Sequence, residues 1–183
     1  SNLQHHNLYF VRNWRENFAA IYETGTVPEH ASLYVCNPSK TDPDLAPPGH
    51  ENLLVLLPLP AGITLTPEQE VSCEDKIIQI LVEMTGEPDL RERIVSQFIY
   101  SPQQFGEQFN AWQYNAFGGE SHVLRQSVLF RTRNRSKKVP NLYYVGAGTL
   151  PGIGLPMCLI SAQLTYKRIV GNHGRGPLSK GDV

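Results

Sequence analysis

The chain has 183 residues, of which 40% are hydrophobic and 18% are charged, and its formal net charge is -1. This length allows one globular domain, or one and part of another, with a sizeable core. The near-zero charge argues against a nucleic-acid-binding protein, and no apolar run is long enough to predict a membrane span. We expect no signal peptide at the polar N-terminus. Three widely spaced cysteines predict neither a disulfide pattern nor a metal pattern and favour a reducing, cytoplasmic compartment.

Hydrophobic patterning predicts three strands in the first third of the chain, at residues 8–11, 32–36 and 53–59. The third run is almost wholly apolar, which favours a central strand buried on both faces. A helix that stops at Gly25 is expected between the first two strands. Its apolar stripe consists of Trp14, Phe18, Ile21 and Tyr22. The proline-rich segment 37–49 is expected to be a loop.

Two helix starts have the pattern of a capping box, in which a Ser or Thr and a Gln three residues later exchange hydrogen bonds with the backbone. They are Thr66-Pro67-Glu68-Gln69 and Ser101-Pro102-Gln103-Gln104. The first helix is expected to end at Gly86. Its buried stripe is expected to be Val71, Ile78, Leu81 and Val82. The second helix is expected to end near Asn110, and a further strand is expected over 93–99.

The most distinctive stretch runs from 141 to 156. Residues 142–145 predict a buried strand, and a glycine–proline loop follows, in which backbone N–H groups can approach something flat or anionic. The helix expected over 155–170 has an apolar face for packing, made of Leu155, Leu159, Ala162, Tyr166 and Ile169. The loop lacks the third glycine of the dinucleotide fingerprint G-x-G-x-x-G. A packing turn and a cofactor-facing loop are therefore both open interpretations.

The order of elements predicts an α+β fold, in which a mixed or antiparallel sheet has helices on one face. The final strand, loop and helix look different, because they resemble one unit of a parallel nucleotide-binding sheet.

Many short motifs occur in the order typical of one family, the phytoene desaturases, which are flavoprotein carotenoid desaturases. They are His5-His6, Ser32-Leu33-Tyr34, Asp42, Leu45-Ala46-Pro47, Gly49, Ser101-Pro102, Phe105, Asn110-Ala111, Ala116-Phe117, Gln126-Ser127, Phe130-Arg131, Asn134-Arg135, Asn141-Leu142-Tyr143 and the loop from Gly146 to Pro156. The chain resembles the C-terminal part of that family from Leu3 to about Val170.

The resemblance implies that residues 3–138 belong to a substrate-binding domain and that 139–171 form the strand, loop and helix of a Rossmann-like FAD-binding domain. Residues 172–183 are expected to be a flexible tail. The family's ADP-binding unit is absent from this sequence. FAD contacts are implied for Ala147, Gly148, Thr149, Gly154, Leu155, Pro156 and Met157. The family commonly has His where this chain has Leu150, which puts an acid–base role there in doubt.

The implied reaction removes two hydrogens across a C–C bond of a polyene, with a hydride passing to flavin and a proton leaving the adjacent carbon. No catalytic base stands out, although Glu120 and His122 lie near an aromatic segment. The aromatic residues Trp112, Tyr114 and Phe117 fit either a polyene channel or a core. The chain alone is expected to be inactive. A carotenoid isomerase, a related flavin oxidase and a non-catalytic lipid-docking module are the alternatives.

Two further features bear on lipid contact and on metal binding. Five cations lie within eight residues, at Arg131, Arg133, Arg135, Lys137 and Lys138. They fit either a solvated loop or contact with anionic lipid headgroups, which would place the protein at the membrane periphery. His5 and His6 are adjacent, and neighbouring strand residues point to opposite faces. We therefore expect no metal site there.

Overall fold

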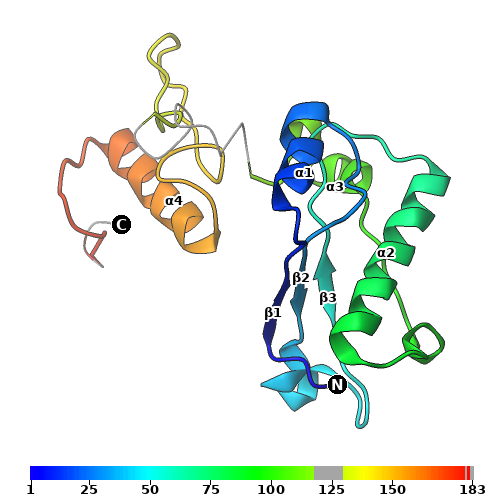
Figure 1. Cartoon of the computed structure of the whole chain (residues 1–183). Helices are drawn as coiled ribbons and strands as arrows, with labels where there is room; N and C mark the ends of the chain where they lie inside the picture. Colours follow the sequence, from blue (N-terminus) through cyan, green and yellow to red (C-terminus); the bar gives the residue numbers. More distant parts are fainter. Residues whose placement is uncertain (118–129, 180, 182–183) are drawn as a thin grey trace. The chain divides into compact units, whose positions relative to one another are not determined.

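A computed structural model describes residues 1–117, 130–179 and 181, and the chain forms two compact units, Ser1–Tyr114 and Asn115–Val183 (Figure 1). The domain boundary that the sequence predicts at 138–139 stays a prediction, because the two units are defined by contacts within this chain alone. Asn134 and Ser136 hydrogen-bond to the backbone of Tyr144 and Leu142, so the basic segment contacts the second unit. No helix in the described ranges is long and apolar enough to cross a membrane.

The first unit is built on a three-stranded antiparallel sheet in the order β1-β2-β3. The strands are β1 (His6–Tyr9), β2 (Leu33–Cys36) and β3 (Leu54–Leu56). The third apolar run was predicted to be a central strand buried on both faces, and this is wrong. Among the described residues, the central strand is β2, whereas β3 pairs only with β2 and exposes Leu54 and Leu56.

Helices in the first unit begin and end largely as the capping signals predict. They are α1 (Trp14–Ala19), which continues as a π-helical turn (Ala20–Thr24), α2 (Pro67–Thr85) and α3 (Pro102–Phe109). Both capping boxes form, at Thr66 and Ser101. Gly25 and Gly86 end their helices in the left-handed conformation, for which glycine carries no steric cost.

One face of the sheet packs on α2. The buried cluster contains Leu3, Leu33 and Val35 together with Leu81 from α2, and Ile77, Ile80 and Met84 pack against it. On the opposite face, cross-strand register aligns Leu8, Tyr34 and Leu56 in one row. Leu8 and Leu56 are exposed, so this row is largely apolar, and the other row on the same face contains His6 and Cys36 beside Leu54.

Three expectations about the first unit are corrected. Val71 of α2 is exposed, and so are Trp14, Phe18 and Tyr22 of the α1 stripe, whose rings contact one another instead of the core. No strand forms over 93–99. A 3₁₀ turn, Leu90–Arg93, is followed by a segment without regular structure, and this segment exposes Val95 and Phe98.

The adjacent histidines do not alternate as a strand would require. Strand β1 begins at His6, and His5 lies in the bend before it. Their ring centroids are 4.3 Å apart. The geometric reason for expecting no joint metal binding is therefore wrong.

The second unit contains α4 (Leu155–Val170) and the segments that pack on it. Residues 142–145 do not form the predicted strand. They make one antiparallel bridge, Arg135 to Tyr143, and a parallel bridge joins Thr132 to Thr149. The segment expected to be a flexible tail also contacts α4, since Lys167 donates to the carbonyls of Gly174 and Gly176.

Candidate functional site

The loop between residues 146 and 154 owes its course to glycine. Gly146, Gly152 and Gly154 have φ values of 103°, 152° and 101°, where a side chain would be strained. Gly148 has no such requirement, because its φ lies outside this range. A Cβ atom added at Gly146, Gly148 or Gly152 would have no described atom within 4 Å. Gly148 and Gly154 are exposed and leave open backbone, whereas Gly146 is half-buried and Gly152 is buried.

The buried side-chain amide of Asn134 fixes the glycine loop through hydrogen bonds. The Asn134 side chain is fully buried, and its Nδ2 donates to Thr149 Oγ1, Leu150 O and Ser161 Oγ, each at 3.0 Å. Its Oδ1 is buried and has no hydrogen-bond partner in the described ranges. One side chain thus joins the basic segment, the glycine loop and α4.

Hydroxyl groups extend this cluster along the helix. Ser161 Oγ accepts from Gly146 N at 3.1 Å and lies 2.9 Å from Thr149 Oγ1. One turn later, Thr165 Oγ1 donates to Tyr144 O at 3.0 Å. Asn134, Thr149, Ser161 and Thr165 are called the amide–hydroxyl cluster below. It docks the loop on α4 through hydrogen bonds.

This docking reverses the face of α4 that the sequence predicted to pack. The buried residues of α4 are Ser161, Thr165 and Lys167. Leu155 is 84% exposed and Leu159 is 69% exposed, and the rest of the predicted stripe is at most partly buried. The sequence signal that identifies the true docking face is the pair Ser161 and Thr165, which lie four residues apart on one helix face.

Arg131 also belongs to the loop and is not part of an exposed basic patch. Its side chain is 7% exposed, and Nη2 donates to Ala147 O at 2.6 Å and to Phe117 O at 2.9 Å. Grouping Arg131 with a lipid-facing patch is therefore wrong. The other four cations, Arg133, Arg135, Lys137 and Lys138, are exposed. Of these, Arg135 lies over the Tyr143 ring, 5.8 Å from its centroid.

The start of α4 leaves backbone donors uncapped. Gly154 is the N-cap and has no side chain to accept a hydrogen bond, and Pro156 has no N–H. The N–H groups of Leu155 and Met157 belong to this first turn, where the helix dipole favours negative charge. The loop and the helix start are thus suited to contact a planar group that carries partial negative charge.

The remaining predicted site residues have separate positions. Thr149 is buried. Its hydroxyl lies in the amide–hydroxyl cluster and its N–H donates to Gly146 O at 3.2 Å, so neither group is left for a ligand. The Leu150 backbone is bonded to both Thr132 and Asn134. Trp112 is exposed, while the Tyr114 ring covers Gly106 of α3, where an added Cβ would meet Tyr114 Cδ1 at 2.1 Å. Phe117 is exposed, and Glu120 and His122 lie outside the described residues.

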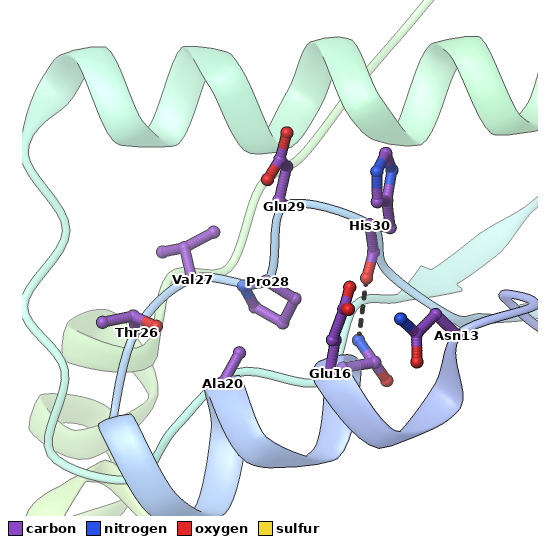
Figure 2. Close-up of a pocket in the computed structure, with 9 residues that line it drawn as sticks. Asn13, Glu16, Ala20, Thr26, Val27, Pro28, Glu29 and His30 are labelled. Atoms are coloured by element: carbon purple, nitrogen blue, oxygen red, sulfur yellow. Dashed lines mark hydrogen bonds between the residues drawn. The ribbon is translucent and has the colours of Figure 1, made fainter.

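The first unit has a separate hollow of about 240 Å³ between α1 and the segment from 26 to 30 (Figure 2). Asn17 Nδ2 closes one side by donating to His30 O at 3.0 Å. The lining includes the polar side chains of Asn13, Glu16 and Glu29. Ligand sites usually have ~300–1,000 Å³ and an apolar lining. This hollow is therefore a poor match for an apolar polyene.

No protein-family model matches the chain, but curated proteins align with nearly all of it. The carotenoid 3,4-desaturase of Haloarcula japonica is 40% identical over 168 residues, which are 92% of this chain and 34% of the relative. The lycopene-forming phytoene desaturase of Pseudescherichia vulneris is 39% identical, over 93% of this chain and 35% of the relative. The 4,4'-diaponeurosporene-forming 4,4'-diapophytoene desaturase of Staphylococcus haemolyticus is 33% identical over the same shares. The chain spans about a third of the length of these relatives.

The amide–hydroxyl cluster predicts a local effect of Ser161→Ala. Removing Oγ takes away the acceptor of the Gly146 N–H, and an unpaired buried group costs about 1–3 kcal/mol. We expect amide hydrogen exchange at Gly146 to accelerate by about tenfold or more. Cys158→Ser, on the same helix outside the cluster, should leave that rate within about twofold. Unchanged protection at Gly146 in Ser161→Ala would show that the cluster does not hold the loop.

Proposed function

Because the chain belongs to the phytoene desaturase family over about nine-tenths of its length, we propose that it is the flavin-facing part of an FAD-dependent carotenoid desaturase. The observation that carries the proposal is the open backbone of the glycine loop, set beside an uncapped helix start. Gly148 has no strained φ, and no described atom would contact a Cβ atom added there. Close approach of a ligand to the backbone is therefore the physical reason that fits a glycine at this position.

The donor set at this site suits an isoalloxazine and its ribityl chain. The backbone of Ala147 and Gly148 would lie along the ribityl-pyrophosphate, with Arg131 fixing the Ala147 carbonyl from the protein side. The N–H groups of Leu155 and Met157 would face the pyrimidine edge, with Gly154 and Pro156 setting the turn. FAD would accept a hydride from a C–H bond of the substrate, and a proton would leave the adjacent carbon, so that the C–C bond between them becomes a double bond. The chain's own residues would orient the ring, and no described side chain is assigned as the base.

The ADP half of FAD needs a second element. A dinucleotide fingerprint would place its pyrophosphate on another helix N-terminus, and this sequence has none. Since the relatives are about three times as long as the aligned region, we infer that residues outside this sequence supply that element. The same residues would provide the Rossmann-like sheet into which residues 139–171 fit, and they would cover the exposed Leu155 and Leu159 of α4.

The open face of the β1-β2-β3 sheet supports an apolar substrate. Leu8, Tyr34 and Leu56 form a cross-strand row there, and Leu54 lies on the same face. A carotenoid precursor offers only hydrocarbon for recognition, so its binding depends on burying apolar area, at about 25 cal/mol per Å². We propose that this face forms one wall of the polyene site and that residues 3–138 belong to the substrate-binding domain.

The FAD proposal predicts the effect of Gly148→Val in the full-length protein. A branched side chain would occupy the space that the cofactor backbone contact needs, so the dissociation constant for FAD should rise by at least about tenfold, or ~1.4 kcal/mol. Gly176→Val is the matched control, because Gly176 is also free of steric contacts at Cβ and has no strained φ. Flavin fluorescence during titration measures both variants. Equal affinity in Gly148→Val and the unchanged protein would refute the contact.

The 183-residue chain alone should bind FAD only weakly and show no desaturation.

A second role, contact with anionic lipid, is favoured by the four exposed cations between Arg133 and Lys138. Each cation near an anionic membrane surface contributes about 1 kcal/mol. The double variant Arg133→Glu/Arg135→Glu should therefore reduce co-sedimentation with phosphatidylserine vesicles by about tenfold or more. Arg12→Glu/Arg15→Glu, which makes the same charge change in the first unit, should have a smaller effect. An equal loss in both double variants would indicate net charge alone, and no loss in either would exclude this role for the basic segment.

A further inference from the structure

Three potential metal ligands converge where β1 begins and β2 ends. His6 and Cys36 are paired directly across the two strands, which places their side chains on the same face of the sheet. His5 precedes β1 in a bend, and its backbone carbonyl accepts from Asn37 N at 2.8 Å. One ring nitrogen of each histidine and Sγ of Cys36 all lie within 4.8 Å of one another.

A second set of side chains orients both imidazoles. His5 Nδ1 lies 2.6 Å from Thr41 Oγ1, and the Thr41 hydroxyl donates its own proton to Pro38 O at 3.2 Å. With the Thr41 hydroxyl donating to Pro38 O, a proton on His5 Nδ1 completes the His5–Thr41 hydrogen bond, and this tautomer has its lone pair on Nε2. His6 Nδ1 lies 2.8 Å from the Tyr34 hydroxyl. Metal-binding histidines typically have such a partner on one ring nitrogen, because it fixes the tautomer and the ring orientation.

Tyr34 lies on the same face of the sheet as the thiol. It precedes Cys36 by two residues in β2, so the side chains of Tyr34, Cys36 and His6 share one face. Cys36 is a free, half-buried cysteine, while His6 is exposed to solvent. The cluster is accessible to an ion from solution.

We propose that His5, His6 and Cys36 form a binding site for a thiophilic transition-metal ion of the zinc class. Two neutral imidazoles and one thiolate are ligands that Zn²⁺ prefers, and three protein ligands leave a fourth position for water. In tetrahedral zinc sites, N and S ligands about 2.0–2.3 Å from the metal lie roughly 3.5 Å apart. Since the ligand atoms lie within 4.8 Å of one another, closing the site requires the side chains to move inward by at most about 1 Å. The ligands lie in the first unit, and the proposal does not depend on the flavin site.

The test is titration of the metal-free, reduced 183-residue chain with Zn²⁺ by calorimetry and with Co²⁺ by absorption. We expect one equivalent of each ion and a thiolate-to-cobalt band in the near ultraviolet. Cys36→Ser should abolish the band, and Cys36→Ser and His6→Ala should each weaken Zn²⁺ binding by at least about tenfold. Tyr34→Phe keeps all three ligands and should weaken binding by about tenfold, as second-layer partners do. Cys158→Ser and His50→Ala remove the same residue types elsewhere and should bind as the unchanged chain does.

Zinc-dependent alkylation provides a readout that needs no variant. Zn²⁺ should protect Cys36 from iodoacetamide while Cys158, also half-buried, reacts at the same rate with and without the ion. Mass spectrometry of peptides assigns the modified cysteine, so the result stands even if Cys36→Ser fails to fold. A cobalt band that survives in Cys36→Ser, or equal alkylation of Cys36 with and without Zn²⁺, would overturn the site.

Discussion

The second unit depends on the buried Asn134 amide. Its Nδ2 donates to the glycine loop and to α4 at once, and hydroxyls from Thr149, Ser161 and Thr165 complete the hydrogen bonding around it. A loop held by apolar packing would need side chains, and side chains would cover its backbone. A loop that is fixed by hydrogen bonds to one buried amide can have glycine, and therefore uncovered backbone, on its other side. The same hydrogen bonds that fix the loop therefore leave the open backbone on which the cofactor proposal rests.

This arrangement has a consequence for α4. Because its polar residues face the loop, its apolar residues, Leu155 and Leu159 among them, face outward within the unit. The open side of the sheet in the first unit likewise exposes Leu8, Leu54 and Leu56. Neither surface gains stability while it is hydrated. Both fit a chain whose relatives are about three times as long as the aligned region.

The sequence predicts correctly those features that depend on residues close together along the chain. The capping boxes at Thr66 and Ser101, and the helix stops at Gly25 and Gly86, form as predicted. Nonlocal features were missed for physical reasons. An apolar run such as 53–59 does not show whether its partners lie on one side or both, and residues 93–99 have strand composition but pair with no described residue. Apolar periodicity in α4 identified a stripe, although the helix docks through Ser161 and Thr165. Arg131 was counted as a surface charge because its carbonyl partners are distant in sequence.

Amide hydrogen exchange of the full-length protein, with and without FAD, tests the central claim most directly. If this chain provides the flavin-facing backbone, FAD should increase protection at Ala147, Gly148, Leu155 and Met157. Residues of the β1-β2-β3 sheet, such as Val35 and Val55, should exchange at the same rate in both states. Unchanged exchange at the loop and the start of α4, in a protein that has bound FAD, would contradict the assignment and place the flavin elsewhere.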